Sequence, residues 1–197
     1  ARRLRRRGRL RQPDGLRRRG RRLRVRVPLP MRLPRVALTV GDPSGIGPEI
    51  ALKAARDSRV TAVCRPVLYG PHAPDAVAAF PAGRVNAPAA MAAYEAIVQA
   101  TADAQRGDVA AVVTAPISKE AFAMAGLPWK GHTDLLAYLC GVPDVAMMFW
   151  SDRLRVVLAT VHIPLAEVPA ALTRDRVRDV ILLTARSLPA FGIAQPH

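Results

Sequence analysis

The chain has 197 residues, half of them hydrophobic, and a formal net charge of +15. This length allows one sizeable core or two small ones. No apolar run approaches the roughly 18 residues that span a bilayer, which excludes a protein with membrane-spanning helices. The two cysteines, Cys64 and Cys140, lie far apart in the sequence. Their spacing excludes a disulfide framework and favours reduced thiols in the cytoplasm.

The positive charge is concentrated at the N-terminus. Residues 1–30 contain 14 arginines and one acid, Asp14, whereas the other 167 residues carry 16 basic and 14 acidic side chains. We expect residues 1–30 to be a disordered arginine-rich tail that binds polyanions without sequence preference. Three origins stay open: a working basic arm, a transit peptide, although the tail lacks serine, or GC-rich upstream DNA read through as protein, with Met31 as the true start.

From Met31 onward, short apolar runs alternate with helix-forming segments. The runs expected to form strands are 35–40, 65–70, 109–115, 145–150 and 154–162. The segments expected to form helices are 48–57, 88–107, 118–126, 132–141 and 174–187, the last with Thr173 as its N-cap. Apolar strands that alternate with helices predict an α/β fold with a mainly parallel sheet and helices on both faces.

The glycine-rich segment TVGDPSGIGPE (39–49) lies between the first strand and the first helix. The spacing of Gly41, Gly45 and Gly47 does not match GxGxxG, and no Lys-Ser/Thr follows, so both the dinucleotide fingerprint and the P-loop are absent. Glu49 places a carboxylate in the first helical turn, where it competes with a bound phosphate. Taken alone, the segment predicts a structural turn rather than a ligand site.

Ligands of open α/β sheets bind beyond the carboxyl ends of the strands. The predicted strands bring Asp42, Lys119 and His162 toward this edge, and a helix start adds His132. Together these residues predict an active site there. Asp42 and Lys119 each keep a structural alternative, Asp42 as a turn former and Lys119 as an exposed helix-start residue.

Four motifs resemble the PdxA family of 4-hydroxythreonine-4-phosphate dehydrogenases: TVGDPSGIGPE (39–49), TAPISK (114–119), GHTDLLA (131–137) and ATVHIPL (159–165). The resemblance covers about Arg32 to His197. It implies a homodimer with a fold similar to isocitrate and isopropylmalate dehydrogenases, which binds NAD without a Rossmann fingerprint. The implied reaction is oxidation and decarboxylation of 4-hydroxythreonine 4-phosphate to 3-amino-2-oxopropyl phosphate in pyridoxal phosphate (vitamin B6) biosynthesis.

The resemblance also implies roles for individual residues. The histidine and threonine of the family's GHT motif contact substrate and correspond to His132 and Thr133. The histidine of its T-x-H-x-P-L motif binds a divalent metal cation (Zn, Mg or Co) and corresponds to His162. Protonated His132 and the Thr133 hydroxyl are expected to hold the anionic substrate. The cation would stabilise the alkoxide and then the enolate. No catalytic acid or base is assigned.

Family members continue past the stretch that corresponds to residues 31–197, and their other two metal histidines lie in that continuation. His197 is not expected to replace them. Because sites of this type need about three protein ligands, we expect an N-terminal part of such an enzyme, inactive by itself. Two alternatives stay open: a sister dehydrogenase for 4-phospho-threonate or phospho-erythronate, and a non-catalytic basic protein that binds nucleic acid through its tail.

Overall fold

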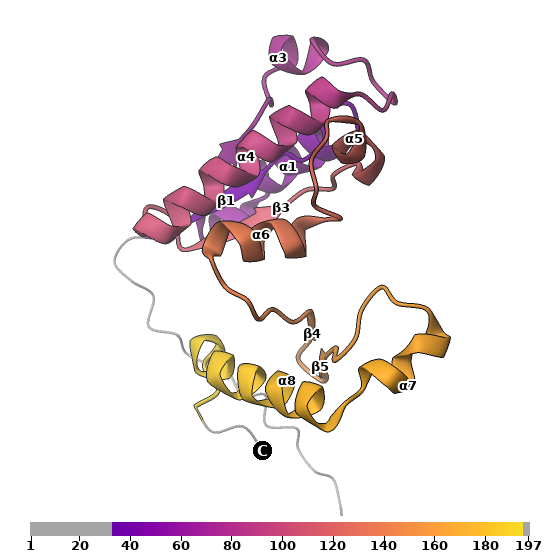
Figure 1. The fold of residues 1–197 in the computed structure, drawn as a ribbon. Coiled ribbons are helices and arrows are strands. Elements are labelled where there is room, and N and C mark those ends of the chain that lie inside the picture. The colour runs from indigo at the N-terminus through magenta and orange to yellow at the C-terminus, as the bar shows by residue number, and fades with distance from the viewer. Residues whose placement is uncertain (1–32, 195–197) are drawn as a thin grey trace, which may run out of the picture.

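The computed structural model of the protein describes residues 33–194. The arginine-rich segment 1–30 and His197 lie outside these residues, so the structure does not test what the sequence predicts for them. The described chain forms a first unit that ends near Gly141 and a smaller second unit that begins near Met148 (Figure 1). Among the described helices, none has the length and apolar character that crossing a membrane requires.

The first unit is built on a three-stranded parallel sheet, so the predicted α/β class is confirmed. Its strands are β1 (Arg35–Thr39), β2 (Arg65–Tyr69) and β3 (Ala111–Thr114). Their order is β2-β1-β3, and β1 pairs in parallel with both neighbours. All three strands therefore end at one edge, which we call the carboxyl edge.

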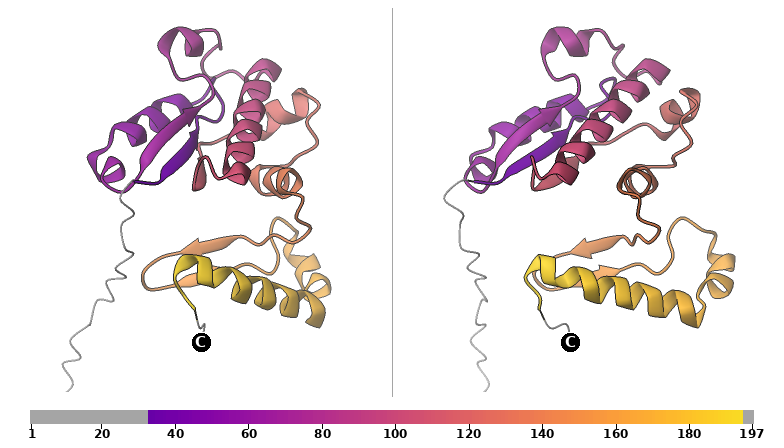
Figure 2. Two further views of the ribbon diagram at one scale, coloured as in Figure 1. Left: turned by 90° about the vertical axis from the view of Figure 1, so that its left-hand side faces the viewer. Right: turned by 60° about the vertical axis from the view of Figure 1, so that its left-hand side comes forward.

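Helices α1 (Gly47–Arg56) and α4 (Ala87–Arg106) cover opposite faces of this sheet (Figure 2). Ala37 packs with buried alanines of α4, whereas the next residue of β1, Leu38, lines a hollow with Ala51 of α1. The small side chains of α4 allow the helix to approach the sheet closely. Since the connections β1-α1-β2 and β2-α4-β3 use opposite faces, a topological switch point lies between β1 and β3, where such folds bind ligands.

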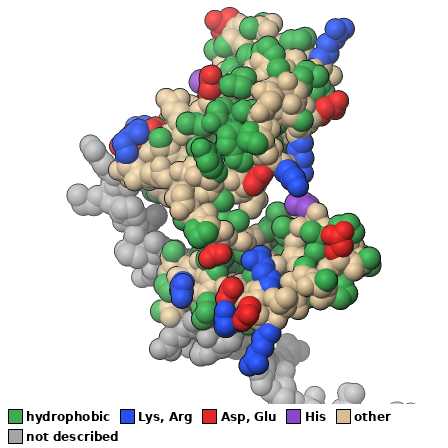
Figure 3. All heavy atoms as spheres, in the orientation of Figure 1, with side chains coloured by type: hydrophobic (Ala, Val, Ile, Leu, Met, Phe, Trp, Pro, Cys, Tyr) green, Lys and Arg blue, Asp and Glu red, His purple; other side chains and the backbone are tan. Residues whose placement is uncertain are grey.

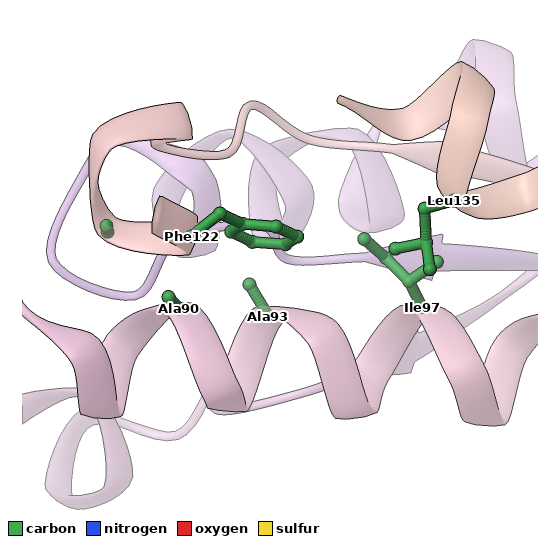
Figure 4. Close-up of a cluster of buried hydrophobic side chains, with 6 residues drawn as sticks. Ala90, Ala93, Ile97, Phe122 and Leu135 are labelled. Atoms are coloured by element: carbon green, nitrogen blue, oxygen red, sulfur yellow. The ribbon is translucent and has the colours of Figure 1, made fainter. Parts of the chain in front are cut away.

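Helix α4 also carries a second cluster of buried residues. Helices α5 (Lys119–Met124) and α6 (His132–Cys140) pack against it. Phe122 of α5, Leu135 of α6 and Ile97 of α4 are almost completely buried and meet in this cluster (Figure 4). This packing fixes α6, and with it the start of the GHT motif, relative to the sheet.

The second unit contains an antiparallel hairpin and a helix. Strands β4 (Met148–Trp150) and β5 (Arg155–Val157) form a separate two-stranded sheet. Helix α8 (Arg174–Ser187) begins as predicted, because the Thr173 side chain accepts the Arg176 N–H at 3.1 Å.

The prediction of a long strand over 154–162 is wrong. β5 ends at Val157, and the backbone bends after Leu158. The Ala159 carbonyl accepts a hydrogen bond from the Arg176 side chain of α8 at 2.9 Å. In a longer strand, this carbonyl would instead accept a backbone N–H from a neighbouring strand.

Five short elements have no counterpart among the predictions. They are α2 (Ser58–Thr61), α3 (Pro74–Ala78), the 3-10 helix Leu165–Glu167, α7 (Val168–Ala171) and the 3-10 helix Leu188–Phe191. Elements of one or two turns are too short to show a hydrophobic period.

Candidate functional site

Close contact between backbone segments determines the shape of the glycine-rich loop, Gly41–Gly47. Gly41 has φ +67°, and a β-carbon there would lie 2.2 Å from the Pro116 carbonyl oxygen. A β-carbon on Gly47 would lie 1.9 Å from the Val40 carbonyl oxygen. Two of the three glycines are therefore needed for packing, in agreement with the prediction of a structural turn.

Asp42 shapes the same loop. Its carboxylate accepts the backbone N–H of Ser44 at 2.8 Å, and its own N–H donates to the Pro116 carbonyl at 2.9 Å. These bonds join the loop after β1 to the loop after β3 at the switch point. They support the structural alternative for Asp42, and its contact with a ligand stays a prediction.

Ser44 and Asn86 form a polar pair that the sequence analysis missed. Ser44 is buried, and its hydroxyl accepts a hydrogen bond from the Asn86 amide at 2.8 Å. Asn86 also caps α4 by accepting the Ala89 N–H at 2.9 Å. An asparagine just before Ala-Pro at the start of a helix is a recognisable capping signal. Its partner 42 positions away in the sequence had no local signal.

The second segment of the site, Lys130–Thr133, consists of the end of a loop and the first two residues of α6, and is called the GHT loop below. The Asp134 carboxylate accepts the backbone N–H groups of Lys130 and Gly131, the latter at 2.9 Å. The carboxylate thereby holds the loop at the first turn of α6. Thr133 is exposed and His132 is half-buried, so the loop presents both predicted substrate contacts from a backbone that is already fixed.

Aromatic side chains anchor the residue just before this loop. The Trp129 ring stacks on Tyr94 of α4 with a centroid separation of 5.2 Å, and it also contacts Tyr138 of α6 at 5.3 Å. Trp129 packs against the Phe122 cluster as well. The sequence alone could not show that these three rings meet.

The environment of His132 differs from the expectation of a protonated ring. Burial lowers the pKa of His132 below its ordinary value, and the charge of Asp134 opposes this shift only in part. The neutral imidazole therefore predominates at neutral pH. Its Nε2 atom is buried and has no hydrogen-bond partner among the described residues. A neutral ring can still exchange one hydrogen bond with a ligand.

Lys119 lies beside the GHT loop. It is the first residue of α5, directly after the Ser118 cap, and its side chain is exposed. Its Cε atom is 3.9 Å from the position that a β-carbon would take on Gly131. The structure therefore brings together three of the predicted residues, Lys119, His132 and Thr133, next to the switch point.

His162 does not follow a strand of the parallel sheet, which corrects the predicted arrangement. It belongs to the irregular segment after β5, in the second unit, because that hairpin is not part of the parallel sheet. Its side chain is exposed, and its φ of +56° is unusual for a residue with a β-carbon. In the view of Figure 3, a histidine and Lys or Arg side chains lie on opposite sides of the gap between the two units.

The described residues do not build a metal centre by themselves. Within residues 33–194, no three histidine, cysteine or carboxylate side chains are close enough together to hold an ion. His162 offers one imidazole, whereas a site of the expected type needs about three protein ligands.

A β2-β1-β3 parallel sheet with two loops that meet at its switch point defines the class of protein: an α/β protein of the type in which ligands bind at the carboxyl edge. The family described as "Pyridoxal phosphate biosynthetic protein PdxA" matches residues 45–197. The chain belongs to this family.

Individual relatives agree with this assignment. A 4-hydroxythreonine-4-phosphate dehydrogenase of Desulforapulum autotrophicum is 35% identical over 83% of this chain and 59% of its own length. A Salmonella typhi protein provisionally named D-threonate 4-phosphate dehydrogenase is 34% identical over 82% of this chain and 61% of its own length. The crystal structure of a 4-hydroxythreonine-4-phosphate dehydrogenase from Burkholderia phymatum superimposes with a TM-score of 0.74 at 29% identity, covering 84% of this chain and 61% of that one. The chain thus spans about three fifths of the length of these relatives.

Proposed function

We propose that the protein acts in the NAD-dependent oxidation and decarboxylation of 4-hydroxythreonine 4-phosphate, a step of pyridoxal phosphate biosynthesis. The observation that carries this proposal is the position of the GHT loop. His132 and Thr133 lie beside Lys119, next to the switch point of the parallel sheet. The chain's membership of the PdxA family supports the same reading. The relatives' names supply the substrate.

The chain's own residues bind and orient the substrate in this proposal. The neutral His132 ring exchanges one hydrogen bond with the substrate in this proposal, and the exposed Thr133 hydroxyl makes another. Asp134 keeps both in place by fixing the backbone of the GHT loop. A site that is ordered before binding spends less binding energy on orienting its ligand. When bound, NAD would accept the hydride of the substrate carbinol, whose hydroxyl proton would be released. The resulting β-keto acid would then lose CO2 and take up a proton.

A second substrate has specific support. One relative carries the name of a D-threonate 4-phosphate dehydrogenase at almost the same identity as the hydroxythreonine enzymes. The two substrates share the 4-phosphate and differ at C2. Calorimetric titration of the chain with each ligand separates the candidates. We expect 4-hydroxythreonine 4-phosphate to bind more tightly, and tighter binding of D-threonate 4-phosphate would reverse the assignment.

We also propose His162 as one ligand of a divalent cation. An exposed histidine held in the left-handed region supports this role, because such strained residues gather at functional sites. Since the described residues offer no complete metal centre, no step of the reaction is derived through the cation.

Paramagnetic Co2+ tests this ligand in the chain itself. Adding Co2+ should broaden the ring-proton NMR signals of His162 before those of His72, whose Nδ1 bonds to the Gly70 carbonyl at 2.8 Å. The His162→Ala variant should lose broadening in the segment after β5, and His72→Ala should keep it. Unchanged broadening around position 162 in His162→Ala would show that this histidine is not the ligand.

Further features support the remaining parts of the proposal. A homodimer would cover the exposed apolar side chains of the second unit, such as Phe149, Ile181 and Phe191, each more than half exposed. We also propose a fold similar to isocitrate dehydrogenase, which would bind NAD without a Rossmann fingerprint. Cys64 and Cys140 are both free thiols, as expected for a cytoplasmic protein.

A further inference from the structure

Lys119 brings a positive charge to the loop that carries His132 and Thr133. The Ser118 hydroxyl caps α5 by accepting the Ala121 N–H at 3.1 Å, which fixes the point where the lysine leaves the backbone. The lysine stem then passes Gly131, with Cε 3.9 Å from the position of a missing β-carbon. A β-carbon at position 131 would only touch this stem at an ordinary van der Waals distance, so the measurement places Lys119 beside the GHT loop without strain.

No carboxylate among residues 33–194 forms an ion pair with Lys119. The ion pairs in this part of the chain involve Lys53, Arg59, Arg106 and Arg178. Asp134, which directly follows the GHT loop, accepts two backbone N–H groups instead. The ammonium group of Lys119 is therefore available to an anion from outside the chain.

The bound substrate needs a cation that His132 does not supply. Burial keeps that ring mainly neutral at pH 7, so it contributes a hydrogen bond without a full charge. A phosphate monoester carries a charge of about −1.5 to −2 at this pH. An ammonium group can donate up to three hydrogen bonds to its oxygens.

We propose that Lys119 binds the phosphate group of the substrate, next to His132 and Thr133. This inference depends on the proposed function, and it adds a specificity-determining residue to that site. Lys119 would select phosphorylated substrates over the free hydroxy acids, because the dianion gains more from a point charge than a single carboxylate does.

Calorimetric titration of the 197-residue chain tests this role. The ligands are 4-hydroxythreonine 4-phosphate, 4-hydroxythreonine and inorganic phosphate. Lys119→Gln removes the charge at similar length, and Lys119→Arg restores it. Lys53→Gln is the control, because Lys53 is an exposed lysine of α1 that is not part of the proposed site. The 14 arginines of residues 1–30 are common to all variants, so only differences between variants are interpreted.

Lys119→Gln should weaken binding of 4-hydroxythreonine 4-phosphate about tenfold or more. Lys119→Arg should restore most of the affinity, Lys53→Gln should change it less than about twofold, and binding of unphosphorylated 4-hydroxythreonine should respond to none of them. Circular dichroism verifies that the variants fold, as expected for an exposed side chain.

The possible failures can be told apart. If the unaltered chain binds the phosphorylated ligand and His132→Asn weakens it while Lys119→Gln does not, the proposed function stands and the role of Lys119 is wrong. If Lys119→Gln weakens both hydroxythreonine ligands equally, the lysine contacts the carboxylate and the phosphate assignment is wrong. If the unaltered chain binds no phosphorylated ligand, the proposed function and this inference both fail.

Discussion

Replacing Gly41 by alanine should lower the free energy of unfolding by about 3 kcal/mol or more. The new β-carbon would lie 2.2 Å from the Pro116 carbonyl oxygen, and the residue would have to keep φ at +67°. Neither the strand end nor the β3 loop can move away without breaking the hydrogen bond from Asp42 to Pro116. Urea unfolding followed by circular dichroism measures the effect.

Gly45→Ala is the matched control in the same loop. A β-carbon at Gly45 would have its nearest neighbour, the Asp42 carbonyl oxygen, at 3.5 Å, which is an ordinary van der Waals contact. We expect a change within about 1 kcal/mol. Equal destabilisation by the two substitutions would mean that the loop depends on glycine flexibility and not on the close contact at Gly41.

Phe122→Ala should destabilise the protein by about 3–5 kcal/mol. The ring is only 1% exposed and fills the space between α4, α5 and α6 (Figure 4). Its loss leaves a cavity beneath the helix that begins with His132. Unfolding is best followed by the fluorescence of Trp129, which packs against the same cluster, in a Trp150→Phe background that removes the only other tryptophan.

Met124→Ala on the same helix provides the comparison. Met124 is 59% exposed, so its truncation should cost less than about 1 kcal/mol. A loss at Met124 as large as the loss at Phe122 would contradict the described orientation of α5.

Local sequence signals predicted the parallel sheet and most long helices. Helix α8 begins after Thr173 and ends at Ser187, as expected, because a cap and a continuous helical segment define it. Helix α4 ends at Gly107, whose φ of +80° explains why glycine stops the helix. The strand expected over 154–162 is shorter, because β propensity does not reveal that the Arg176 side chain bonds to the Ala159 carbonyl.

The site shows the same division between local and long-range information. Lys119 lies shortly after a predicted strand, and His132 lies at the start of a predicted helix. These local positions were enough to predict that the two residues lie close together. The neutral state of His132 depends on its burial, and the Ser44–Asn86 bond depends on a distant pairing. The place of His162 after a separate hairpin depends on tertiary structure that short sequence motifs do not contain.

In the proposed function, the substrate binds at the carboxyl edge of the parallel sheet. A titration of the 15N-labelled chain with 4-hydroxythreonine 4-phosphate tests it most directly. We expect chemical-shift changes of backbone amides in three places: the glycine-rich loop 41–47, Lys119 and the GHT loop. Changes confined to the opposite edge, where Arg35 and Arg65 line a separate hollow, with none at Gly131 to Thr133, would contradict it.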